Sequence, residues 1–201
     1  MGPSTECNVV LVTKENLGEF THPDHPLHPG YEFLSDTHRA DYLRTYFSHI
    51  YGGGYSDIKF QRGSWLSSFE ALEARPEMFA IGYKEYSYGV PAYLNTAAGV
   101  PLSNFWEMLI GNGAYIFRSR TDFTEEWFRG LRQVMDVKLE SLRQNPSRFP
   151  QDTTGVVYEG VESGYPLSWS EVLGDIFHPV CYKYSDKLLN TLPPPIFNDY
   201  R

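Results

Sequence analysis

Two acidic and two basic residues whose chemistry suits a phosphorylated ligand lie within residues 35–59. Asp41 and Arg44 are three residues apart in a stretch with helical spacing, so their side chains are expected on one face of a helix. Asp57 and Lys59 follow three glycines and are two residues apart, which predicts one face of a strand. Carboxylates bind Mg²⁺ and Mn²⁺, and cationic side chains neutralise phosphate. Residues of these types can therefore hold a divalent metal ion or an anionic ligand.

The residues between the two pairs predict a helix, a glycine turn and a strand. Ser35 can cap the N-terminus of the helix, and the glycines at 52–54 let the chain leave it. We expect positive φ for at least one of these glycines, because a helix must turn sharply into a strand there. The strand is expected over residues 55–60. The apolar stripe expected to face the core comprises Ala40, Leu43, Phe47 and Ile50.

Further elements follow from short apolar runs and from helical periodicity. Residues 8–13 (NVVLVT), 79–83 and 114–117 are predicted strands. The longest helix is predicted to begin at residue 122 or 124 and to end at the Asn-Pro pair at 145–146. A capping pair at positions 168 and 171 predicts a short helix through residue 176. Alternating strands and helices predict an α/β sheet with a ligand site at one edge.

The motif around the four charged residues resembles the sugar-nucleotide site of DXD-type glycosyltransferases. The likeness is greatest to the group associated with capsular polysaccharide synthesis and to the mannosyltransferase-like sugar-binding domain. That pattern is roughly Ala-Asp-x-x-Arg, then Tyr-Gly-Gly-x-Tyr-x-Asp-x-Asp. The residues that match are Ala40, Asp41, Arg44, Tyr51, Gly52, Gly53, Tyr55 and Asp57, whereas Lys59 stands at the second acidic position.

The resemblance implies a fold, an activity and a cofactor. The fold would be a GT-A-like (Rossmann-like) mixed sheet flanked by helices, forming one small domain over residues 1–201. The activity would be transfer of a sugar from a nucleoside-diphosphate sugar, with UDP favoured, to a glycan or glycoconjugate. Asp57 would hold Mn²⁺ or Mg²⁺, Asp41 and Arg44 would hold the donor sugar, and Tyr55 would pack near it. Lys59 would contact a phosphate, pair with Asp57 or point to solvent.

Four residues outside this motif are further candidates. His178 resembles the C-terminal residue that often completes the metal site of such enzymes. Glu85 follows a predicted strand and is the candidate general base on the acceptor side, which an inverting transferase needs and a retaining one does not. Asn104 and Asn112 fall near where family members line the donor and acceptor cleft.

Each assignment has a structural alternative. Asp41 and Arg44 could be a helix-surface ion pair that contributes little. Asp57, Asn104 and Asn112 could be turn residues, and His178 could be a structural hydrogen-bonding histidine. For the whole chain, the alternative is a non-catalytic domain that binds a sugar nucleotide or carbohydrate on the same scaffold. Hydrolysis of a sugar nucleotide in the presence of metal would separate the two functions.

Composition limits the classes of partner. A net charge of −8 and the lack of a Lys/Arg cluster argue against a nucleic acid as the main partner. No apolar run reaches the roughly 18 residues of a membrane span and no signal-peptide pattern is present, so we expect a soluble, cytoplasmic chain. Two isolated cysteines predict thiols rather than a disulfide framework. The aromatic content of 16% suits carbohydrate binding, although most of the rings are expected in the core.

A histidine-rich loop, HPDHPLHP, precedes the predicted helix. The prolines predict a polyproline-like path with His22, His25 and His28 on one face, about 9 Å apart. That spacing is too long for one metal ion, so an ordered loop is the predicted role.

Overall fold

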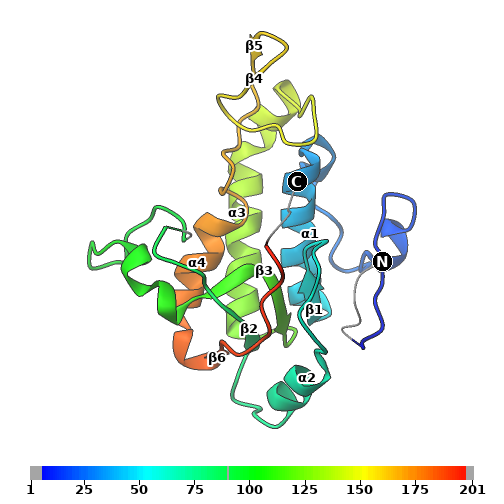
Figure 1. Cartoon of the computed structure of the whole chain (residues 1–201). Helices are drawn as coiled ribbons and strands as arrows, with labels where there is room; N and C mark the ends of the chain where they lie inside the picture. Colours follow the sequence, from blue (N-terminus) through cyan, green and yellow to red (C-terminus); the bar gives the residue numbers. More distant parts are fainter. Residues whose placement is uncertain (1–5, 90, 198–201) are drawn as a thin grey trace.

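The computed structural model describes residues 6–89 and 91–197, which form one small α/β domain (Figure 1). Two helices, α1 (Asp36–Ile50) and α3 (Asp122–Gln144), run side by side and pack on each other. The other helices are α2 (Leu66–Glu73) and α4 (Gly174–Lys183). The strands are β1 (Gly53–Ser56), β2 (Ala80–Lys84), β3 (Ile110–Phe117), β4 (Val157–Tyr158), β5 (Val161–Glu162) and β6 (Leu188–Leu189). Short 3-10 helices occupy Leu17–Phe20, Tyr31–Phe33, Leu102–Met108 and Ser185–Lys187.

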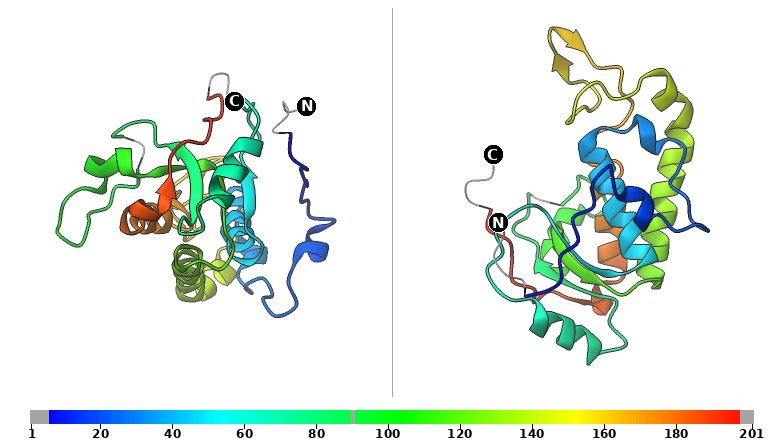
Figure 2. Two further views of the ribbon diagram at one scale, coloured as in Figure 1. Left: turned by 90° about the horizontal axis from the view of Figure 1, so that it is seen from below. Right: turned by 90° about the vertical axis from the view of Figure 1, so that its right-hand side faces the viewer.

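The main sheet has the order β1-β3-β2-β6. Strand β3 pairs antiparallel with both β1 and β2, whereas β6 pairs parallel with β2. The predicted mixed sheet flanked by helices is therefore confirmed, and Figure 2 shows the helices around it. The strands predicted at 79–83 and 114–117 are β2 and the second half of β3.

Three apolar clusters hold these elements together. One lies between the sheet and helices α3 and α4 and contains Tyr115, Trp127 and Phe177. A second lies between α1 and α3 and includes Tyr46 and Leu131. The third packs α2 on the sheet. Aromatic rings fill much of this space, which agrees with the expectation that most of them belong to the core.

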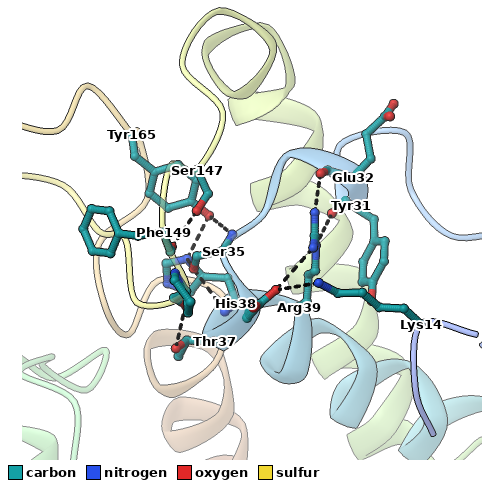
Figure 3. A network of polar contacts seen from close by, with 12 residues as sticks. Lys14, Tyr31, Glu32, Ser35, Thr37, His38, Arg39, Ser147, Phe149 and Tyr165 are labelled. Carbon is teal, nitrogen blue, oxygen red and sulfur yellow. Dashed lines mark hydrogen bonds and ion pairs between the residues drawn. The ribbon is translucent and has the colours of Figure 1, made fainter.

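A buried polar network fixes the start of α1 (Figure 3). Ser35 caps the helix by accepting a hydrogen bond from the backbone N–H of His38, as predicted. The His38 ring lies 2.9 Å from the Tyr165 hydroxyl through Nδ1 and 3.1 Å from the Ser168 carbonyl through Nε2. The Ser35 N–H donates to the same tyrosine. These contacts join α1 to the segment that follows α3 and so fix the direction in which α1 presents its polar residues.

The predicted strand at residues 8–13 is not formed. Val9, Val10 and Leu11 are 79%, 62% and 69% exposed, and the described part of this segment has no ladder partner. β-Branched residues favour a strand only where a neighbouring strand and a buried face are present, and both are lacking here.

Three local predictions differ from the structure. The buried face of α1 carries mainly polar and aromatic residues, and Ala40 of the predicted stripe is exposed. The last helix runs from Gly174 to Lys183 rather than from 168 to 176: the Glu171 side chain does accept from the Ser168 N–H, as in a capping box, but residues 169–173 form turns. The histidine loop turns back at His22–His25, so these rings are only 5.4 Å apart. The polyproline path was therefore wrong.

Candidate ligand-binding site

Arg44 is the centre of a buried charge network that joins the two segments of the motif to β3. Its Nη2 lies 3.0 Å from the Asp41 carboxylate on α1 and 3.6 Å from that of Asp57, just after β1. Its Nη1 donates to the Asn112 carbonyl on β3 at 2.9 Å. The Asp41–Arg44 pair is therefore not a surface ion pair, since both side chains are at least nine-tenths buried.

Asp57 is held by two further donors. The Tyr55 hydroxyl donates to Oδ1 at 2.8 Å, and the Lys59 ammonium lies 2.9 Å from Oδ2. The backbone N–H of Asp57 donates to the Gly113 carbonyl, which fixes the carboxylate beyond the last residue of β1. The predicted strand over 55–60 thus ends at Ser56, yet the expected proximity of Asp57 and Lys59 is present.

Aromatic rings enclose the guanidinium. It lies 4.5 Å from the centre of the Tyr55 ring, which stacks on Tyr115 at 5.4 Å. Burial, partly offset by Arg44, raises the pKa of Tyr55 above its usual value, so its hydroxyl stays a hydrogen-bond donor at neutral pH. Arg44 Nε is buried and has no hydrogen-bond partner in the described part of the chain. An unused buried donor is costly and is a feature of sites that bind a ligand.

Burial also affects Asp41. Its removal from water raises the pKa of the carboxyl group to about 6, against the opposing attraction of Arg44. The group therefore changes charge near neutral pH, which allows Asp41 either to pair with Arg44 or to donate a hydrogen bond to a ligand.

Glycines place the two halves of this site. Gly52 and Gly53 have φ of 68° and 86°, which confirms the predicted turn between α1 and β1. On β3, a Cβ on Gly113 would lie 3.2 Å from Asp57 Oδ2 and 3.3 Å from the Tyr83 hydroxyl. A Cβ on Gly111 would overlap the Tyr83 ring. The alternating glycines of IGNG therefore make room for Tyr83 beside Asp57.

Glu85 and His178 form a second buried pair. Both are 3% exposed, and His178 Nε2 lies 3.6 Å from Glu85 Oε2. His178 Nδ1 accepts from the backbone N–H of Ala92 at 3.0 Å, which assigns the proton of a neutral ring to Nε2, facing Glu85. Nε2 has no hydrogen bond within the described residues. The general-base candidate and the metal-ligand candidate are thus each other's neighbours.

The residues present do not fit the implied metal ion. No group of three His, Cys, Asp or Glu side chains suited to a metal is found among residues 6–89 and 91–197. Both Asp57 oxygens already face cations or a hydroxyl donor, and His178 faces Glu85 instead of Asp57. A metal at Asp57 would have to displace the Lys59 ammonium, which is 10% exposed and only 2.9 Å away.

The two asparagines do not behave as expected of cleft side chains. Asn112 contributes its backbone carbonyl to Arg44. Asn104 is exposed in the 3-10 helix Leu102–Met108. Tyr115, whose ring stacks on that of Tyr55, was not singled out from the sequence. The glycine alternation at 111–113 marks the close approach of the bulky Tyr83 side chain.

Searches against protein-family models, curated proteins and solved structures find no match to this chain. Within the described ranges, no helix has the length and apolar character needed to cross a membrane.

Proposed function

We propose that the chain is a glycosyltransferase that binds a nucleoside-diphosphate sugar, with UDP favoured, at the Asp41–Arg44–Asp57–Lys59 network. The observation that carries the proposal is the meeting of these residues, which come from two separate motif segments, around one buried guanidinium. A planar guanidinium with an unused N–H, beside a lysine, suits the charged oxygens of a diphosphate.

In this proposal the charges of the chain act on the departing diphosphate. Arg44 and Lys59 offset the negative charge that develops as the glycosidic bond breaks, and Asp41 accepts hydroxyls of the donor sugar. Glu85, which is held next to His178, is assigned in this proposal to the acceptor side, where a glycan or glycoconjugate would bind. A divalent metal ion would supply the same neutralisation. The Asp57 oxygens that would have to bind it already face cations or a hydroxyl donor.

A non-catalytic sugar-nucleotide-binding domain is the second candidate. The observation that favours it is the mutual pairing of the four charges, since structural ion-pair networks have this arrangement as well. Release of free sugar or its transfer from UDP-sugars would support the enzyme, whereas UDP binding without turnover would support the second candidate.

Calorimetric titration with UDP tests the site itself. We expect Lys59→Ala to weaken UDP binding at least tenfold and binding to persist in EDTA, because the lysine supplies charge that a metal would otherwise supply. Asp57→Asn should keep the metal-independent binding. Lys183→Ala, which removes an exposed lysine paired with Glu126, is the matched control and should have no effect on UDP binding.

Loss of UDP binding in EDTA, together with loss of UDP binding in Asp57→Asn, would indicate the metal-assisted form. No UDP binding under any condition would refute the proposal.

A further inference from the structure

A recessed surface of about 450 Å³ lies between the histidine loop, α1 and α3. It is lined by His25, His49, Glu125, Phe128, Arg129, Arg132, Gln133, Asp136 and Val137. None of these belongs to the ligand-binding site proposed above. The volume falls within the range of small-molecule sites, roughly 300–1,000 Å³. We call this surface the α3 pocket.

The two carboxylates of the α3 pocket are already paired with histidines. Glu125 lies 3.5 Å from His49 Nε2, and Asp136 lies 3.0 Å from His28 Nε2. Both partner rings are buried, with 8% and 4% of the side chain exposed, so the pairs are fixed by the fold. Both carboxylates are therefore directed toward histidine ring nitrogens.

Neither arginine of the pocket lies within ion-pair distance of a carboxylate in the described part of the chain, where Glu125, Glu126 and Asp136 pair with other side chains. Arg129 attracts Glu126 over a longer distance, and the Arg132 guanidinium lies 6.0 Å from the centre of the Phe128 ring. Both side chains are exposed and lie one turn apart on α3, so the two guanidiniums can converge on one ligand. Gln133 adds an amide donor. Guanidiniums present several N–H groups in one plane, which suits the oxygens of a phosphate.

The floor of the pocket is aromatic. The rings of His49 and Phe128 stack at 4.9 Å with an angle of 16° between their planes, and Val137 provides an exposed apolar side chain. A ligand that combines an anionic group with a flat apolar group would satisfy both parts of the surface.

We propose that the α3 pocket binds a small phosphate monoester, whose phosphoryl group contacts Arg129 and Arg132 and whose flat part lies toward Phe128 and Val137. The site gives a role to the histidine loop: His28 and His25 hold the loop against α3 and α1, and the loop forms one wall of the pocket. The proposal is independent of the glycosyltransferase proposal, since the two sites share no residue.

Calorimetric titration with phenyl phosphate at pH 7 and low ionic strength tests this site. We expect the double variant Arg129→Ala, Arg132→Ala to lose at least tenfold in affinity, because each charge-assisted hydrogen bond contributes on the order of a tenfold change. Arg143→Ala, an exposed arginine near the end of the same helix, is the matched control and should bind as the wild type does. Phenol should bind more weakly than phenyl phosphate.

Three results would overturn the proposal. One is the absence of phenyl phosphate binding to the wild type, and another is unchanged affinity in the double variant. An effect of Lys59→Ala equal to that of the double variant would move the binding to the Arg44 network. Sedimentation with vesicles that contain phosphatidic acid separates a lipid headgroup from a free ester: binding to vesicles without binding to phenyl phosphate would also contradict the small-molecule form.

Discussion

The turn at Gly52 connects the α1 half of the candidate site to Asp57, and its replacement by alanine should be severe. Gly52 has φ of 68°, and a Cβ there would lie 2.7 Å from the backbone nitrogen of Ser119 and 2.8 Å from the carbonyl oxygen of Phe117. The left-handed backbone alone costs about 1–2 kcal/mol for a residue with a Cβ. The two contacts are with backbone atoms, which cannot turn away as a side chain can. We therefore expect Gly52→Ala to lower the free energy of unfolding by about 3 kcal/mol or more.

The next glycine provides the control. Gly53 has φ of 86°, but a Cβ there would meet no atom within 4 Å. Gly53→Ala should therefore lose only the backbone contribution of about 1–2 kcal/mol. Urea unfolding of the two variants and the wild type, with similar m values, gives the difference directly. Equal losses would show that the contacts with Ser119 and Phe117 do not matter, and a loss below about 1 kcal/mol in Gly52→Ala would refute the reasoning on this turn.

Two buried groups predict opposite dependences of stability on pH. Burial lowers the pKa of His38 below the usual histidine value of about 6.5, so the unfolded chain takes up a proton more readily. The free energy of unfolding should fall as pH decreases through about 6.5, and His38→Gln should flatten that part of the curve; an unchanged slope would contradict a buried neutral ring. Burial raises the pKa of Asp41 from 3.8 to about 6, so its contribution is full below pH 3.8 and is lost as pH rises through 6. The free energy of unfolding of the wild type should thus fall by about 3 kcal/mol as pH rises over that range, and Asp41→Asn should abolish this fall. A variant that is less stable than the wild type above pH 6 would mean that pairing with Arg44 outweighs burial.

The sequence predicts elements well where a local signal has no competitor. Ser35 caps α1, two of the three glycines after this helix have positive φ, and α3 ends at the Asn-Pro pair, because each feature depends on one or two neighbouring residues. Residues 8–13 carry an equally clear strand signal, but a strand needs a partner, which no local pattern supplies. The buried face of α1 was misjudged for a similar reason: polar side chains such as His38 are buried there because partners from distant segments accept their hydrogen bonds.

In the candidate site, too, the sequence predicts the local contacts and misses those between distant segments. The motif predicted that Asp41, Arg44 and Asp57 share a site and left the role of Lys59 open, and the structure brings all four side chains together. The sequence did not predict that Glu85 and His178 would meet. These residues are far apart in the chain, and they meet only when the start of the 85–101 loop lies against α4.

The lysine at position 59 decides the electrostatics of this network. With an acidic residue there, Asp41, Asp57 and the third carboxylate would outnumber Arg44 and leave a net charge of −2, which a buried site must offset with a metal ion. With Lys59, two carboxylates face two cations, so the charges of these four described residues sum to zero without any ion. A diphosphate must then attract Arg44 and Lys59 away from their carboxylates. Protonation of Asp41, whose pKa is about 6, releases Arg44 for this purpose. Diphosphate binding should accordingly be accompanied by uptake of a proton near neutral pH, which is the reverse of the proton release that accompanies metal binding.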